Sequence, residues 1–116
     1  MNENLYVSLE VARLLKEKGY NEKCITYYQD NCREIYYSFC GERNSDWEER
    51  CVSAPSKAEV INWLESKGMC IVVIRRTINN EVGWCYAIYN QTEITSGFKT
   101  RSEAEDAAII DALENL

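Results

Sequence analysis

The feature that most constrains the fold of this sequence is an apolar run at Met69–Ile74, the longest one in the chain. β-Branched residues dominate this run, which predicts a strand over 70–77 that is buried on both faces. Residues 79–81 are typical of a turn. The side chains from Trp84 to Tyr89 then alternate between two faces, and a third short strand is expected around 93–98. The stretch therefore predicts a hairpin or short meander at the centre of a small sheet.

Three helical segments lie outside this stretch. Each follows a residue that commonly caps a helix N-terminus, namely Ser8, Ser56 and Thr100. The first two end at glycines, Gly19 and Gly68, which readily adopt the left-handed conformation after a helix. Apolar residues recur at helical spacing in all three segments. The predicted helices span 9–18, 57–67 and 101–116.

Another hairpin is predicted between the first two helices. Residues 24–28 and 34–40 are rich in β-branched and aromatic side chains, as strands are, and the polar residues 29–31 lie between them. The charged segment Gly41–Cys51 is interpreted as a surface loop. With 116 residues and 46% hydrophobic composition, the chain suits one globular domain. We predict a single α+β domain over 1–116, with three helices packed on a mostly antiparallel sheet of 4–5 strands.

The charge balance and the chain's start narrow the possible partners. The chain has 13 basic and 19 acidic side chains, a net charge of −6. Nucleic-acid binding depends on cations that neutralise phosphates, so this balance argues against nucleic acid. Residues 1–20 lack the features of a signal peptide, and the apolar run is too short to span a bilayer. We expect a cytoplasmic protein without a membrane partner, whose cysteines are reduced thiols.

The sequence contains no histidine, which removes Ser-His and Cys-His catalytic pairs and all histidine-containing metal sites. The six cysteines have no closely spaced pair of the kind that binds zinc, although a site assembled from distant loops stays possible. Cys51, beside Arg50, is the best candidate for a reactive thiol. No glycine-rich phosphate loop is present. We therefore predict no enzyme activity and no catalytic, cofactor-binding or metal-binding residues.

Aromatic residues of the first hairpin are the main candidates for a functional surface. Neighbouring residues of a strand point to opposite faces, so one tyrosine of each adjacent pair should leave the core. Exposed Tyr and Trp are enriched at protein interfaces. The alternative is that these rings only cover a sheet edge with their hydroxyls in water. The candidate interaction surface consists of Tyr27, Tyr28, Tyr36, Tyr37 and Trp47.

The last predicted helix has a regular spacing of small and apolar residues, namely Ala104, Ala107, Ala108, Ala112, Leu113 and Leu116. In this spacing the C-terminal part resembles the end of a double-stranded RNA-binding domain, a family with a helix, a three-stranded sheet and a final helix. The positions of the family's phosphate-binding lysines hold Ser102, Glu103, Glu105 and Asp106 instead. The resemblance therefore implies the packing of the helix rather than RNA binding. The alternative of nucleic-acid binding would use Arg75, Arg76, Lys99 and Arg101.

Three further blocks, YVSLEVARLLKEKGY, SAPSKAEVINWLESK and FKTRSEAEDAAIIDALENL, resemble a family of small proteins from phages and prophages of gut Bacteroidetes. The likeness covers essentially the whole chain, except for the cysteine-rich hairpin and loop. It implies a phage-related accessory protein in the host cytoplasm, and it transfers no activity or catalytic residue. Together these observations predict a non-enzymatic protein that binds another protein, or a second copy of itself, through the tyrosine-rich hairpin and residues 41–51.

Overall fold

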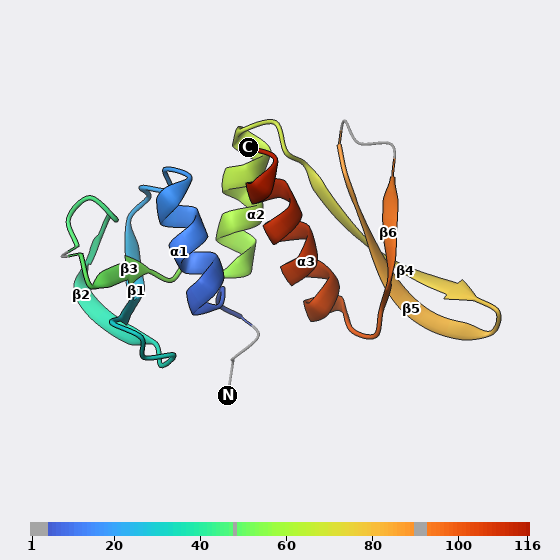
Figure 1. Cartoon of the computed structure of the whole chain (residues 1–116), viewed down its shortest axis with the longest axis horizontal. Helices are drawn as coiled ribbons and strands as arrows, with labels where there is room; N and C mark the ends of the chain where they lie inside the picture. Colours follow the sequence, from blue (N-terminus) through green and yellow to red (C-terminus); the bar gives the residue numbers. More distant parts are fainter. Residues whose placement is uncertain (1–4, 48, 90–92) are drawn as a thin grey trace. The chain divides into compact units, whose positions relative to one another are not determined.

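The computed structural model describes residues 5–47, 49–89 and 93–116. It contains three helices and six strands, and it divides into two units, residues 1–56 and 57–116. Each unit has its own three-stranded antiparallel sheet (Figure 1). The α+β class and the three predicted helices are confirmed. The single sheet of 4–5 strands is wrong, because the strands form two separate sheets. That residues 1–56 and 57–116 form one domain stays a prediction.

The first unit consists of one helix and a sheet with the strand order β2-β1-β3. Its elements are α1 (Leu9–Glu17), β1 (Cys24–Gln29), β2 (Tyr36–Glu42) and β3 (Cys51–Ser53). The short β3 was not predicted, since it lies where the predicted loop Gly41–Cys51 ends. It pairs with β1 and completes the sheet. Of that loop, residue 48 lies outside the described residues.

Helix α1 begins and ends as its sequence predicts. The Ser8 side chain accepts a hydrogen bond from the backbone N–H of Val11 at 3.2 Å, which satisfies one of the free donors of the first turn. Gly19, just past the C-terminus, has a φ of 91°, a conformation that disfavours other residues. The helix buries Leu9, Val11, Ala12 and Leu15.

One face of the first sheet belongs to the core. Cys24, Thr26 and Tyr28 alternate along β1 and are all buried. The Tyr28 hydroxyl donates a hydrogen bond to the carbonyl oxygen of Val7 at 2.6 Å, just before α1. The Thr26 hydroxyl donates to the carbonyl oxygen of Ala54 at 2.6 Å. These bonds satisfy the polar atoms that this face buries.

The second unit has the order helix, three strands, helix. Its elements are α2 (Lys57–Ser66), β4 (Ile71–Ile78), β5 (Glu81–Ile88), β6 (Ile94–Phe98) and α3 (Arg101–Glu114), and β5 is the central strand. Asn79 and Asn80 both have a positive φ, which suits a tight two-residue hairpin turn between β4 and β5. This order is the one that the resemblance to double-stranded RNA-binding domains implies, and the resemblance itself stays a prediction.

Helix α3 covers one face of the second sheet and lies beside α2 (Figure 1). The side chain of Thr100 accepts from the backbone N–H of Glu103 at 3.2 Å, as the predicted cap requires. The small residues Ala104, Ala108 and Ala112 are fully buried, so the helix can approach the sheet closely. The Tyr86 hydroxyl of β5 donates to the Asp111 carboxylate of α3 at 2.6 Å. The face of the sheet that α3 covers is therefore the one that carries Tyr86.

The prediction that the first strand of this sheet is buried on both faces is wrong. Val72 and Ile74 are 47% and 40% exposed, whereas Ile71 and Val73, on the other face, are half-buried. The physical reason is the position of β4 at the edge of the sheet, with helix packing on one face only. None of the helices in the described ranges is long and apolar enough to cross a membrane.

Candidate functional site

The outer face of the first sheet carries three aromatic rings in contact. Tyr27 of β1 pairs with Tyr36 of β2, and their ring centroids are 5.7 Å apart. The indole of Trp47 lies over Tyr27, with the centroids 4.5 Å apart. Such distances give favourable ring contacts. We call Tyr27, Tyr36 and Trp47 the aromatic platform.

The strand register places the platform and explains how Trp47 is held. Tyr27 pairs with Ser53 of β3, so the two side chains share a face. The Trp47 indole N–H donates to the Ser53 hydroxyl at 2.7 Å. Ser53 is completely buried. The indole is therefore held at a fixed position on the outer face of the sheet.

The loop that precedes Trp47 is held by a buried asparagine. The Asn44 amide N–H donates to the carbonyl oxygen of Tyr20 at 2.7 Å, and its oxygen accepts from the backbone N–H of Ser53 at 2.9 Å. The backbone N–H of Trp47 in turn donates to the Asn44 carbonyl oxygen at 3.3 Å. This segment was predicted to be a surface loop, but Asn44 is only 6% exposed. A loop fixed in this way loses little conformational entropy when it binds a partner.

Tyr36 gives the platform an accessible polar group. Its side chain is 37% exposed, and its hydroxyl lies 3.6 Å from the Cys32 sulfur. That hydrogen bond, with the nearby charge of the same sulfur, raises the pKa of Tyr36 above its ordinary value of 10.0. Because the hydroxyl proton is donated to Cys32, the hydroxyl oxygen can accept a hydrogen bond from a bound partner.

Two exposed apolar side chains lie on the same two strands as the platform tyrosines. Ile25 of β1 is 56% exposed and Phe39 of β2 is fully exposed. The pairing of β1 with β2 is irregular between Cys24 and Thr26, where β2 has extra residues and Phe39 lies. Bulges of this kind at an edge hinder the addition of another strand. Contact at this edge would therefore involve side chains more than backbone.

The structure brings together three of the five predicted surface residues. Tyr28 is excluded, because it points into the core and its burial raises the pKa of the phenol. Tyr37 pairs with Thr26, so it belongs to the opposite face, where it is 66% exposed. Sequence reasoning missed Ile25 and Phe39. The alternation along β1 could have identified Ile25, but the bulge that exposes Phe39 leaves no clear signal.

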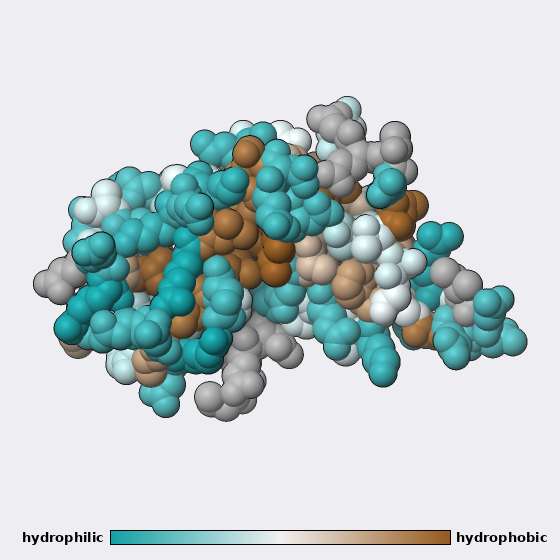
Figure 2. Space-filling view, in the orientation of Figure 1, coloured by the Kyte–Doolittle hydropathy of each residue, from teal (hydrophilic) through white to brown (hydrophobic). Residues whose placement is uncertain are grey.

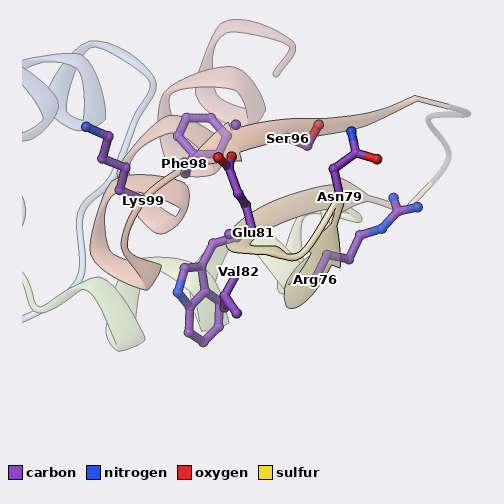
Figure 3. Close-up of a pocket in the computed structure, with 10 residues that line it drawn as sticks. Arg76, Asn79, Glu81, Val82, Ser96, Phe98 and Lys99 are labelled. Carbon is purple, nitrogen blue, oxygen red and sulfur yellow. The ribbon is translucent and has the colours of Figure 1, made fainter.

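The four cations of the alternative prediction are not gathered into one patch. Arg75 and Arg76 are adjacent in β4, so they point to opposite faces, and Arg101 lies 3.7 Å from the Glu105 carboxylate. Arg76 and Lys99 line a cavity of about 350 Å³ with Glu81. They lie at opposite ends of it and point away from each other (Figure 3).

The cysteines are all free, and they do not form a cluster. Cys24 and Cys85 are buried, Cys40 is exposed, and the other three are partly exposed. Within the described residues, no group of three or more Cys, Asp or Glu side chains is placed to hold a metal ion. Cys51 lines a hollow of about 340 Å³ together with Arg13, Lys16 and Arg50. Asp30 and Glu49 line the same hollow, so its charged side chains are of both signs.

Comparisons with protein-family models, with curated proteins and with solved structures find no match to this chain.

Proposed function

We propose that this chain is a non-enzymatic accessory protein that binds another protein through the aromatic platform. The observation that supports this most directly is the hydrogen-bonded frame that holds Trp47 over Tyr27. The exposed side chains Ile25 of β1 and Phe39 of β2 offer further apolar contact area on the same two strands. An interface of this kind has rigid aromatic anchors at its centre. Phage origin is proposed from the sequence resemblance, and a cytoplasmic location from that resemblance together with the sequence of residues 1–20 and the shortness of the apolar run.

The chemistry of the platform indicates the partner's surface. Tyr27, Tyr36 and Trp47 offer apolar rings, with the Tyr36 hydroxyl oxygen as an exposed hydrogen-bond acceptor. A complementary surface would be apolar, with a hydrogen-bond donor near its edge. Because the rings contact one another, a planar group would stack on the outside of the cluster and not between two rings. This favours the shallow side-chain contacts of a protein surface.

The experiment is a quantitative pull-down from the native host, with the captured protein identified and its affinity then measured by calorimetry. Tyr36→Ala and Phe39→Ala remove exposed rings and should leave the fold intact, because neither side chain is in the core. Each should weaken binding at least about tenfold, the loss of 1.4 kcal/mol or more expected of an aromatic anchor.

The matched control is Tyr89→Ala, which removes a ring that is 69% exposed in the second unit. It should bind the same partner as tightly as the wild type. The proposal is wrong if Tyr36→Ala and Phe39→Ala bind as tightly as this control. It is also wrong if the wild type captures no partner at any salt concentration.

Nucleic-acid binding is a second candidate, through the cavity of the second unit. Arg76 and Lys99 line it together with Trp84 and Phe98, and aromatic rings can stack on single-stranded bases. Glu81 in the same cavity and the net charge of −6 oppose it. A gel shift at low salt with single-stranded and double-stranded probes tests it, since the absence of retention would remove this candidate.

A further inference from the structure

The face of the second sheet opposite α3 is apolar and open. Val72 and Ile74 of β4 lie on it, opposite Ala87 and Cys85 of β5, and Ile94 of β6 pairs with Ala87. Val72, Ile74 and Ile94 are 40% to 52% exposed. Figure 2 shows the apolar surface where β6 begins. Exposed apolar side chains gathered on one sheet face mark a surface that another molecule can cover.

The two strands of this face differ in the size of their side chains. In β4 the residues on it are Val72, Ile74 and Arg76, all large. Their partners in β5 are small, namely Ala87, Cys85 and Gly83. Each large residue of β4 therefore lies next to a small residue of β5, of which Ala87 and Gly83 are partly exposed and Cys85 is fully buried.

The same face carries one cation and one anion near the β4–β5 turn. Arg76 shares the face with Ile74, and Glu81 shares it with Gly83 and Cys85, by the alternation of strand residues. Among the residues that the structure describes, neither side chain forms an ion pair. Figure 3 shows the Arg76 guanidinium and the Glu81 carboxylate pointing apart. Both line the cavity of about 350 Å³.

We propose that this face binds a second copy of the chain, about a two-fold axis that runs parallel to the strands between β4 and β5. The rotation sets β4 of each copy over β5 of the other. Val72 then packs on the partly exposed Ala87 of the other copy, and Ile74 packs on the side chains that cover its Cys85. Arg76 lies over Gly83 of the other copy and reaches its Glu81. A two-fold axis repeats every contact, so the interface has two such ion pairs.

The shape and the charges of this face both favour a second copy of the chain as the binding partner. Sheets that pack face to face interdigitate their side chains within a layer about 10 Å thick, and here the large residues of one copy meet the small residues of the other. The patch consists of three residues of β4, four of β5 and Ile94 of β6, so it is smaller than the roughly 800 Å² that each partner buries in a standard interface. The dimer is therefore weak and reversible, with a dissociation constant on the order of 100 µM.

The test is sedimentation equilibrium of the full chain from about 10 µM to 1 mM. The wild type should show a reversible monomer–dimer equilibrium. Arg76→Glu and Glu81→Arg should each raise the dissociation constant at least about tenfold, since each places like charges together twice. The double variant carrying both substitutions restores opposite charges and should dimerise nearly as well as the wild type. Thermal unfolding confirms that each variant is folded.

The matched control is Arg75→Glu. Arg75 is the neighbour of Arg76, but it pairs with Trp84 and belongs to the opposite face of the sheet. This variant makes the same change of charge and should dimerise as the wild type does. A wild type that is monomeric at 1 mM overturns the proposal. So does a control that weakens the dimer as much as Arg76→Glu, or a double variant that stays as weak as the single ones.

A second measurement tests the register directly. A mixture of isotope-labelled and unlabelled protein should give intermolecular nuclear Overhauser effects between the methyl groups of Val72 and Ala87. A dimer whose intermolecular contacts instead map to the aromatic platform or to another surface overturns the proposal. The inference does not depend on the proposed function, because the platform belongs to the first unit and the variants are different.

Discussion

Lys57 forms a buried ion pair whose removal should destabilise the second unit. It is the first residue of α2 and is only 6% exposed. Its ammonium group donates to the Ser102 hydroxyl at 2.7 Å and lies 2.8 Å from an Asp106 carboxylate oxygen. These contacts join the first turn of α2 to the first turns of α3. We predict that Lys57→Met, which keeps most of the side-chain volume, destabilises the fold.

The magnitude follows from the exposure of the two partners. A hydrogen bond to a charged group contributes about 1.5–3 kcal/mol, and breaking a fully buried ion pair costs about 3–5 kcal/mol. The Asp106 side chain is 49% exposed, so water can solvate its carboxylate once the ammonium group is gone. The methionine also restores apolar contacts. We expect a loss of about 2 kcal/mol in the free energy of unfolding, near the lower of these two ranges.

Urea unfolding followed by circular dichroism measures this loss. Lys99→Met is the matched control, since Lys99 is exposed in the same unit, and it should change stability by less than about 0.5 kcal/mol. Asp106→Asn keeps an acceptor for the ammonium group and should cost less than Lys57→Met. If Lys57→Met unfolds at the same urea concentration as Lys99→Met, with an unchanged slope, the ion pair does not stabilise the fold.

Three other outcomes are expected. Asn44→Ala should cost about 2–3 kcal/mol in urea unfolding, because it leaves two buried backbone groups without their partners. Burial, and secondly a hydrogen bond to a carboxylate, raises the pKa of Tyr86. The folded protein therefore holds the Tyr86 proton more tightly than the unfolded chain does. The resulting contribution to the free energy of unfolding is complete below pH 10, and it is lost as pH rises through the raised pKa. Tyr86→Phe should have a flatter profile in alkaline unfolding. A thiol reagent should modify Cys40 first and leave Cys24 and Cys85 unreacted until the protein unfolds.

Local signals in the sequence identified the helices well. Ser8 and Thr100 cap helices because their hydroxyls accept hydrogen bonds from nearby backbone N–H groups, and this chemistry needs no distant partner. The alternation rule likewise predicted that one tyrosine of each adjacent pair leaves the core. It could not say which one, because the contact of Tyr28 with Val7 depends on residues far apart in the chain.

The rest of the candidate site depended on long-range pairing. Trp47 joins the platform only because β3 pairs with β1 and brings Ser53 beneath the indole. A strand of three residues has little sequence signal of its own. Lys57 was part of a predicted helix start, and its burial could not be foreseen, since it depends on Ser102 and Asp106 of a helix far along the chain.

The wrong prediction for β4 is informative about the second sheet. Ile71 to Ile74 is continuously apolar, a pattern typical of strands that are covered on both faces, yet helix α3 covers only one face. A strand at the edge of a half-covered sheet would normally alternate polar and apolar residues. The proposed dimer would supply the second cover, because Val72 and Ile74 would then be buried against the other copy. Arg76 would mark the end of the buried stretch, where its charge meets Glu81. If the open face stays solvated at every protein concentration, dimerisation does not explain its apolar residues. In that case the double variant Val72→Thr, Ile74→Thr should have the same association state and solubility as the wild type.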